Sequence, residues 1–436
     1  MSHKIIVARI SAITSIAGAD KIVAASVLGE TVVVGKDSSV GDIGLFFPVD
    51  LQLSEQFCRE NNLFRKAGQN ADKTKTGFFD ENRRVRAQPF LKVKSSGLFM
   101  PLSSIDYTGY CSADFIEGQA FDELNGVKLV QKYISKASKE KGESNKIKTA
   151  KKDYAPFFAK HVDSEQFRHY ADKIKAGSLV HIHAKVHGTS ARMGFLPVMQ
   201  ELPKWKAKLN KWIGHITKKK TFHEEYVYDY VVGTRNVVLK TGDETKVGFH
   251  GPESYRFDAF EQVKPFLEKG MCVYGELAGY ANGKPIMPEH SVEALKSKDF
   301  VKKYGKTVVY KYGCAEHQTR FHIYRITMTT EAGTAIDFTQ AQLDDWCASR
   351  GLLGPVAVTP SFIYDGDVEA LRQLVDELTE RPDVLTEDFI DPSHISEGVI
   401  IRVDGPSLIP DFYKSKSFAF KVMEGIMEIC DPEDSA

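Results

Sequence analysis

Four short apolar runs occupy the first 50 residues of the chain. They are rich in Val, Ile and Phe, are separated by Gly, Asp and Ser, and cover residues 4–13, 21–29, 30–37 and 42–50. Short β-prone runs that turn residues interrupt at this spacing are typical of a small barrel or sandwich. We therefore predict a β-rich domain over residues 1–127.

A second β-prone cluster, at residues 82–102, is basic. Its alternation places Arg84 and Arg86 on one side and Val85 on the other, with Lys92 and Lys94 further along. A basic strand face on a small barrel is suited to nucleic acid, so we predict that these four cations bind it. The pattern is equally typical of a solvated face that binds nothing.

The bulk properties of the chain restrict its partners and compartment. Its 436 residues suffice for two or three domains, and its formal net charge is +0, so nucleic-acid binding must rest on local patches. Six cysteines form no CxxC pair, and no apolar run reaches the roughly 18 residues that span a membrane. We expect a cytoplasmic protein without a membrane partner.

Residues 128–152 separate the barrel from the remainder of the chain. They carry nine lysines against Glu140 and Glu143, which predicts a basic linker. The remainder, residues 153–436, mixes two periodicities. We predict a strand over residues 178–184 and helices over residues 163–177, 339–350 and 367–380.

Six pieces of sequence after residue 180 place a charged or aromatic residue at the edge of a β-prone run. In chain order they are "KVHG" with Lys185, "GTRN" with Arg235, "VYGELAG" with Glu276, "FHIYRI" with Tyr324, "SEGVIIR" with Glu397, and "FYKSKSF" with Lys414 and Lys416. Each piece alone arises by chance in many chains. The ordered set is a much stronger signal.

The ordered set resembles motifs I, Ia, III, IIIa, IV and V of the covalent nucleotidyltransferase superfamily, which contains polynucleotide ligases and mRNA capping enzymes. "KVHG" in place of the widespread KxDG resembles the RNA ligase branch, and the N-terminal part resembles the OB-type domain of Deinococcus- and Naegleria-type RNA ligases. The resemblance implies an α+β fold. An OB-like β-barrel would precede an ATP-grasp-like nucleotidyltransferase (adenylation) domain built on antiparallel sheets with flanking helices.

The resemblance also implies a role for each piece. Lys185 would attack the α-phosphate of ATP, since desolvation or a nearby cation can lower the pKa of a lysine from about 10.4. Gly188 would let the turn approach the nucleotide. Glu276 would contact the ribose and Glu397 would lie near the metal, so both carboxylates are predicted ligands of Mg²⁺, or of Mn²⁺ in its place. The predicted nucleotide-binding residues are Val186, His187, Gly188, Arg235, Glu276, Tyr324, Glu397, Lys414 and Lys416.

Several assignments stay open at this point. Phe321 competes with Tyr324 for the stacking position, Lys421 competes with the Lys414 and Lys416 pair, and His187 either touches the nucleotide or packs. Ala184 stands where several RNA ligases carry a glutamate that reads the adenine, which weakens the inference to ATP. Ser190, with Arg192 nearby, stands at a predicted phosphate contact. We expect structural roles for His181, His183 and His250.

The resemblance predicts an ATP-dependent RNA ligase that joins 3′-OH and 5′-phosphate ends through lysyl-AMP and adenylylated RNA. Only 20 residues follow Lys416, so no second OB domain is expected there, in contrast to DNA ligases and capping enzymes. The alternatives are a GTP-dependent capping-type guanylyltransferase, a ligase that prefers DNA ends, and an inactive nucleic-acid-binding protein. We expect RNA as the partner and a monomeric protein.

Overall fold

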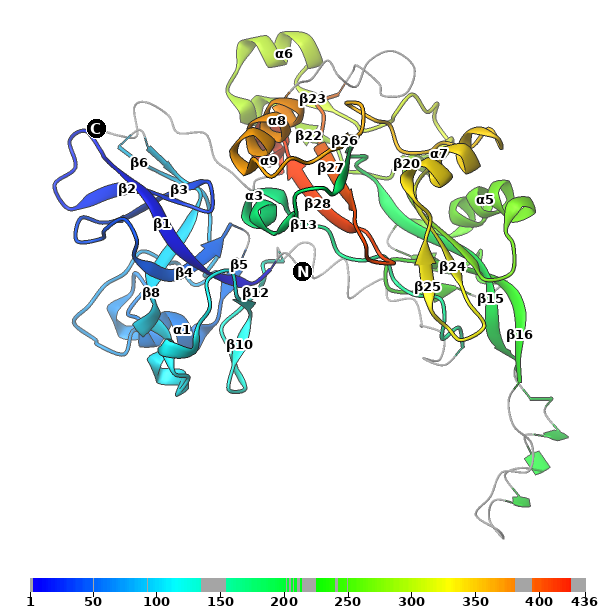
Figure 1. Cartoon of the computed structure of the whole chain (residues 1–436), viewed down its shortest axis with the longest axis horizontal. Helices are drawn as coiled ribbons and strands as arrows, with labels where there is room; N and C mark the ends of the chain where they lie inside the picture. Colours follow the sequence, from blue (N-terminus) through cyan, green and yellow to red (C-terminus); the bar gives the residue numbers. More distant parts are fainter. Residues whose placement is uncertain are drawn as a thin grey trace.

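The structure is a computed structural model that describes residues 3–49, 51–91, 93–134, 154–200, 225–239, 242–248, 250–380 and 394–424, with short pieces at 202–203, 205–206, 208–209 and 212–213. These residues form an N-terminal β-barrel followed by a part with two antiparallel sheets and flanking helices (Figure 1). The predicted α+β class is thereby confirmed. Within the described residues no helix is long and apolar enough to cross a lipid bilayer.

The N-terminal barrel is built from the four predicted apolar runs and the segments that close on them. Its main sheet has the order β3-β2-β1-β4-β8, and β9 also pairs with β1. In β2 every second residue is buried, as alternation predicts, whereas β4 is buried on both sides after its first residue. The strands are β1 (Ile5–Ser15), β2 (Ile22–Val27), β3 (Glu30–Gly35), β4 (Ile43–Pro48), β8 (Gly97–Pro101) and β9 (Ala120–Phe121).

Shorter elements complete the barrel. Strand β12 pairs with β5, so residues up to Lys132 belong to this part, beyond the predicted bound at residue 127. The remainder of the predicted linker, residues 135–152, lies outside the described residues. The elements are β5 (Leu51–Leu53), α1 (Glu55–Glu60), β6 (Gln88–Phe90), β7 (Val93–Ser95), β10 (Glu123–Leu124), β11 (Val127–Lys128) and β12 (Val130–Lys132).

The predicted basic strand is only partly a strand. Val85 is buried and its neighbours Arg84 and Arg86 are not, so the predicted alternation is confirmed. Among the described residues around the two arginines, the only strand pairing is a bridge between Arg84 and Gln52, whereas Lys94 lies on β7, which pairs with β6. Of the described strands in the predicted cluster, only β8, at its end, joins the main sheet. The side chain of Lys92 lies outside the described residues.

Two sheets make up the second part, and they are antiparallel except that β13 runs parallel to β28. One has the order β13-β28-β27-β14-β26 and the other the order β17-β16-β15-β20-β24-β25. The first contains β13 (Glu165–Gln166), β14 (Leu179–Ala184), β26 (Phe362–Ile363), β27 (Gly398–Asp404) and β28 (Asp411–Lys416). The second contains β15 (Thr189–Gln200), β16 (Glu225–Thr234), β17 (Val238–Leu239), β20 (Met271–Ala281), β24 (Thr319–Thr329) and β25 (Ala335–Asp337), with β21 (Lys284–Pro285) beside β20.

Helices flank the two sheets, and two minor strand pairs lie beside them. The helices predicted near residues 339–350 and 367–380 are α7 and α8, and α8 buries Leu371, Val375 and Leu378 as its spacing predicts. The helix predicted over 163–177 is only α3 and one 3₁₀ turn, because Glu165 and Gln166 pair with β28 instead. The helices are α3 (Phe167–Tyr170), α5 (Ser254–Val263), α6 (Lys298–Tyr304), α7 (Gln340–Ala348), α8 (Val368–Glu380) and α9 (Phe418–Met423), and the minor strands are β18 (Val247–Gly248), β19 (Gly251–Pro252), β22 (His290–Ser291) and β23 (Thr307–Val308).

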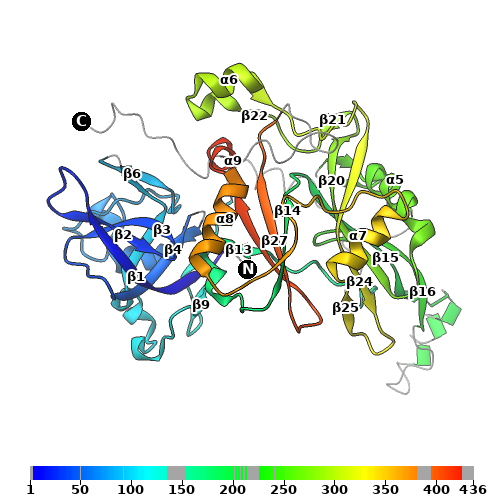
Figure 2. The same cartoon turned by 45° about the horizontal axis from the view of Figure 1, so that its top comes forward.

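The barrel and the first sheet share one apolar core. Phe46 and Val27 from the barrel are buried in the same cluster as Phe167, Leu371 and Ile401. Figure 2 shows α8 between the barrel strands and the sheet of β27. This shared core fixes the barrel beside the sheet that carries the end of β14.

Candidate active site

The turn 185–188 carries the chain from one sheet to the other. Lys185 directly follows β14 of the first sheet, and Thr189 begins β15 of the second. Two hydrogen bonds hold the turn. The backbone N–H of Lys185 donates to the carbonyl of Gly398 at 2.9 Å, and that of His187 donates to the hydroxyl of Tyr312 at 2.7 Å.

Gly188 is required by packing within the protein. A Cβ at this position would lie 2.3 Å from the carbonyl oxygen of Leu277 and 2.9 Å from the Cγ of Glu276. The sequence led us to expect a close approach to the nucleotide. The contact that excludes a side chain is instead with β20, and it brings the turn beside Glu276.

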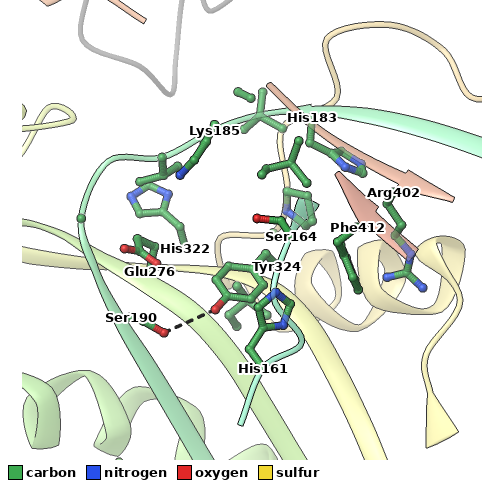
Figure 3. Close-up of a pocket in the computed structure, with 18 of the residues that line it drawn as sticks. His161, Ser164, His183, Lys185, Ser190, Glu276, His322, Tyr324, Arg402 and Phe412 are labelled. Carbon is green, nitrogen blue, oxygen red and sulfur yellow. Dashed lines mark hydrogen bonds between the residues drawn. The ribbon is translucent and has the colours of Figure 1, made fainter. Parts of the chain in front are cut away.

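A cavity of about 410 Å³ lies between the two sheets, next to this turn. Of the predicted site residues, the cavity lining includes Lys185, Val186, Gly188, Arg235, Glu276 and Tyr324. Figure 3 shows Lys185 and Glu276 near one end, Arg402 and Phe412 near the other, and the ring of Tyr324 between them. Residues from separate segments of the chain therefore converge on one cavity, as the ordered set predicts.

A β-bulge directs Tyr324 into this cavity. Tyr274 pairs with Arg325 and Gly275 pairs with Ile323, so Tyr324 is the extra residue on β24. Bulges of this kind re-aim a side chain and are common beside active sites. The hydroxyl of Tyr324 lies 3.5 Å from that of Ser190, the contact drawn as a dashed line in Figure 3.

Phe321, the other candidate for the stacking position, belongs to the core. It is buried in the cluster beneath the second sheet, and its ring fills the space that a Cβ on Gly275 would occupy. The structure therefore places Tyr324, and not Phe321, at the cavity.

Lys185 and Lys416 share one buried carboxylate. The Nζ of Lys185 lies 3.0 Å from Oε1 of Glu397, and the Nζ of Lys416 lies 3.4 Å from the same oxygen. Glu397 is only 2% exposed. Its burial would raise the pKa of the carboxyl, but the two ammonium groups outweigh that effect and hold the pKa well below its usual value. Glu397 is therefore ionised at neutral pH.

Glu276, the second predicted carboxylate, behaves in the opposite way. Burial raises its pKa to about 7, the nearby Lys185 ammonium offsets part of this, and the charge of Glu397 adds to it. A divalent cation would favour the ionised form, and Mg²⁺ prefers carboxylate oxygens, so Glu276 suits a metal. Glu397 faces two ammonium groups through Oε1, while its Oε2 has no hydrogen bond to a described residue, so its predicted role as a metal ligand stays a prediction. The described residues contain no group of three His, Cys, Asp or Glu side chains that could hold a metal.

Lys414 and Lys416 both reach the neighbourhood of Lys185, but they have different environments. Burial, with repulsion from Lys185 and Lys416, lowers the pKa of Lys414 to about 8, and its Nζ donates to the carbonyl of Ser164 at 2.8 Å. Lys416 also bonds Glu424 at 2.9 Å, and its two carboxylate partners raise its pKa against the effect of burial. Lys421, the alternative cation, lies further out, near Glu30 of the barrel.

The ring of His187 does not line the cavity. It packs against the rings of Tyr310 and Phe420, with centroids 4.9 and 4.8 Å away, and its Nδ1 lies 3.6 Å from Glu397. The sequence left open whether His187 touches the nucleotide or packs inside the protein, and in the structure its ring is packed. The predicted nucleotide contact by His187 would need the ring to leave these neighbours.

Two arginines near the predicted phosphate contacts have different surroundings. The side chain of Arg235 is 58% exposed at the cavity and forms an ion pair with Asp163. Arg192 is buried and donates to the carbonyls of Thr234 and Phe158. Arg192 therefore supports the backbone, while Arg235 remains accessible to a ligand.

A second cavity, of about 650 Å³, lies where the barrel meets the first sheet. Arg84 and Lys94 from the barrel line it, together with Lys414 and Lys416. The guanidinium of Arg84 lies over the ring of Tyr133 at 4.7 Å, which is also in the lining. Arg86, predicted alongside Arg84, is not among the lining residues. The two cavities adjoin through Lys414 and Ser164, since Ser164 lines the first.

The sequence reasoning missed half of the first cavity. His183 was expected to be structural, yet it lines the cavity, and the lining residues that were not singled out at all include His161, His322, Gln340, Arg402 and Phe412. Strand periodicity was an available signal for His183, since it lies two residues before the predicted Lys185. His161 packs its ring on Tyr324 at 4.8 Å from a segment without regular structure, which no periodicity predicts.

Comparison with known proteins agrees with this architecture. A family model described as an OB-fold domain matches residues 5–102. Among solved structures, an apo variant of the Naegleria gruberi RNA ligase is similar, at 16% identity and a TM-score of 0.58 over 97% of this chain and 99% of that one. The chain has the fold of this RNA ligase. No curated protein matches its sequence.

Two further structures of the Naegleria gruberi RNA ligase carry ligands. A variant with ATP and Mn is 16% identical, with a TM-score of 0.56 over 98% of this chain and 99% of that one. The ligase with PPi is 17% identical, with a TM-score of 0.57 over 96% and 97%. The RNA-ligase-like fold, with an OB fold at its N-terminus, is the one that the resemblance predicted.

Proposed function

We propose that the chain is an ATP-dependent RNA ligase. The observation that carries the proposal is the convergence of Lys185, Glu276 and Tyr324 on one cavity, with Glu397 and Lys416 directly behind the lysine. The Naegleria gruberi RNA ligase structures with ATP and Mn and with PPi support the same ligands here. The predicted domains fit this function, with an OB-like domain over residues 1–127, a linker over 128–152, whose first residues pair with the barrel through β12, and an adenylation domain over 153–436.

The proposed reaction begins with nucleotide transfer to the protein. The neutral amine of Lys185 attacks the α-phosphorus of ATP, a P–N bond forms, and the bond to the β-phosphate breaks with release of pyrophosphate. The Lys185 ammonium must lose a proton before this attack. Lys414 and Lys416 supply positive charge where negative charge builds on the phosphate oxygens. Tyr324 offers a ring face on which the base stacks, and Arg235 grips a phosphate.

The later steps join two RNA ends. AMP passes from Lys185 to an RNA 5′-phosphate, and the 3′-OH of the second end then displaces AMP to form the phosphodiester. The cavity between the barrel and the first sheet suits the RNA backbone, since Arg84 and Lys94 face Lys414 and Lys416 across it. Mg²⁺, or Mn²⁺ in its place, supplies charge neutralisation in each step when it is bound, with Glu276 as the fitting ligand.

Label transfer from nucleotide to protein tests the proposal. Incubation with α-labelled ATP and Mg²⁺ should give a labelled protein, and added pyrophosphate should remove the label. Lys185→Arg keeps the charge that faces Glu397 but lacks a nucleophilic amine, so it should take no label. Lys306→Arg, at an exposed lysine, is the matched control and should label normally. Label retained by Lys185→Arg refutes the nucleophile.

Two parallel reactions separate the remaining alternatives. Label transfer from GTP in preference to ATP would indicate a capping-type guanylyltransferase and not an ATP-dependent ligase. Sealing of nicked duplexes with RNA or DNA on either side of the break distinguishes an RNA ligase from a ligase of DNA ends. Strand binding without label from either nucleotide would show an inactive nucleic-acid-binding protein.

A further inference from the structure

Two residues that line the first cavity near Asp404 each have a buried polar atom without a hydrogen-bond partner. Gln340 and Arg402 both line the cavity and are 3% and 2% exposed. The Oε1 of Gln340 and the Nη1 of Arg402 each lack a hydrogen bond to any described residue. Buried polar groups are nearly always satisfied, and those that are not are costly to keep, so such a pair at a cavity points to a ligand.

One carboxylate fixes both residues in place. The Nε of Arg402 donates to Oδ1 of Asp404 at 2.7 Å, and the backbone N–H of Gln340 donates to Oδ2 at 3.3 Å. The Nη2 of Arg402 donates to the carbonyl of Phe338. Arg402 and Gln340 are therefore held around Asp404 before any ligand arrives.

The chemical identity of the two free atoms follows from these bonds. The Nε2 of Gln340 donates to Asp344 at 2.7 Å, which fixes the orientation of the amide and leaves Oε1 as an acceptor. The Nη1 of Arg402 can only donate. This end of the cavity thus presents a donor on Arg402 and an acceptor on Gln340, near the Nδ1 of His161, which also lacks a hydrogen bond to any described residue.

This end of the cavity suits an uncharged ligand group. The charge of Arg402 is balanced by Asp404, and burial lowers the pKa values of His161 and His183 to about 3, so these two rings are neutral. The ammonium group of Lys185 lies at the other end, near Glu276 (Figure 3). Phosphates belong beside Lys185, and the base belongs beside Gln340 and Arg402.

We propose that Gln340 and Arg402 read the edge of the nucleobase and select adenine. The proposal rests on the proposed nucleotide site. Adenine presents an amino donor at N6 beside an acceptor, N7 on one edge and N1 on the other, so either edge satisfies both residues. Guanine presents two acceptors, O6 and N7, on the first edge, which places an acceptor against Gln340 Oε1. Its other edge presents the acceptor O6 and the donor N1–H, and adds the amino group at N2 as a second donor that needs a further acceptor.

This pair supplies the base recognition that Ala184 cannot provide. Ala184 has no polar side chain, and Tyr324 stacks on any base. Gln340 and Arg402 lie on α7 and β27, far from Lys185 in the sequence, and they carry the discrimination in its place.

Equilibrium binding of monophosphates tests this inference without any chemistry. AMP has no pyrophosphate leaving group and cannot transfer to Lys185. Calorimetry therefore compares the affinities of three ligands that differ in the base: AMP, GMP, and purine riboside 5′-monophosphate, which lacks the 6-amino group. We expect AMP to bind about tenfold or more tighter than either of the others, because a bidentate base contact is worth that much discrimination. Equal binding of AMP and the analogue overturns the proposal.

A matched pair of variants assigns the discrimination to the residue. Gln340→Met keeps the length of the side chain and removes the acceptor, so AMP and the analogue should then bind within about twofold of each other. Gln373→Met, at an exposed position on α8, should keep the tenfold ratio. Because the ratio is measured within one protein, a loss of stability does not mimic the effect. A ratio unchanged in Gln340→Met overturns the role of Gln340.

Deaza analogues test Arg402 in the same way. Its donor must meet N7 or N1, so either 7-deaza-AMP or 1-deaza-AMP should bind about tenfold more weakly than AMP. Full affinity for both overturns the role of Arg402. The ligase proposal is tested by a different result. If the protein prefers AMP over the analogues but takes no label from ATP, the adenine site is supported and the ligase activity is refuted.

Discussion

The Nζ of Lys185 lies 3.0 Å from Oε1 of Glu397, on a carboxylate that Lys416 also contacts. The predicted nucleophile is therefore one of two lysines that form ion pairs with the buried carboxylate of Glu397. Two ammonium groups compensate for the burial of Glu397, and Glu397 in turn holds Lys185 at the edge of the cavity. Replacing Lys185, Lys416 or Glu397 by a neutral residue leaves uncompensated charge. Such a change should therefore affect both the stability of the protein and its activity.

Glu397→Gln should impair both properties. The amide cannot balance Lys185 and Lys416, so we expect the free energy of unfolding at pH 7 to fall by about 3 kcal/mol, as for a broken buried ion pair. Label transfer from ATP should fall at least about a hundredfold. The pKa of Glu397 is held below its usual value, so its stabilisation is present above pH 4.5 and is lost as the pH falls below it. Urea unfolding at pH 7 and pH 3.5 measures this, with Glu424→Gln, at a more exposed carboxylate, as the control.

Glu276→Gln should instead stabilise the protein at alkaline pH. The pKa of Glu276 is raised from 4.5 to about 7, so the folded chain keeps a proton that the unfolded chain has lost, and stability falls as the pH rises through that window. A difference of 2.5 units corresponds to at most about 3 kcal/mol. We expect a gain of up to that size at pH 8 and almost none at pH 4, although label transfer is lost. Equal unfolding free energies of variant and wild type at pH 8 would contradict the burial of this carboxyl.

The sequence predicted those features of the fold and the site that depend on local residue patterns, and it did not predict those that depend on packing between distant segments. The barrel strands, α7, α8 and the lysine at the end of β14 follow from periodicity and turn residues. The bulge that aims Tyr324 depends on the register between β20 and β24, which no local pattern shows. The reason for Gly188 depends on the approach of β20, and the role of His187 on neighbours more than a hundred residues away.

Tyr312→Phe tests the support of the lysine turn. The Tyr312 hydroxyl accepts the backbone N–H of His187 at 2.7 Å, so its removal leaves a donor without a partner and should cost about 1–3 kcal/mol of stability. Label transfer should slow because Lys185 loses its fixed position, while the affinity for AMP stays within about twofold. Tyr310→Phe is the matched control, since the hydroxyl of Tyr310 is buried without a partner and its removal should be neutral or stabilising. A similar loss in both variants would contradict a specific role of Tyr312.

Lys414 should make pyrophosphate binding depend on pH near 8. Burial and the neighbouring ammonium groups lower its pKa to about 8, so Lys414 is charged at pH 7 and largely neutral at pH 9. We expect the affinity for inorganic pyrophosphate, measured by calorimetry, to fall about tenfold or more over this range, as a charge-assisted contact is lost. Lys414→Arg keeps its charge and should show only the smaller change due to protonation of pyrophosphate itself. An identical pH profile in both proteins would remove Lys414 from the phosphate site.

Arg84 and Arg86 provide a matched test of the cavity between the barrel and the first sheet. They lie two residues apart, yet only Arg84 lines this cavity with Lys94, Lys414 and Lys416. If the RNA backbone passes through it, Arg84→Ala should weaken binding of a 5′-phosphorylated RNA strand and reduce the slope of log affinity against log salt by about 0.7, the value for one phosphate contact on a single strand. Arg86→Ala should leave both quantities unchanged, because its side chain lies outside the cavity. Fluorescence anisotropy across a salt series measures both slopes, and equal losses in the two variants would show a diffuse basic surface in place of a defined path to Lys185.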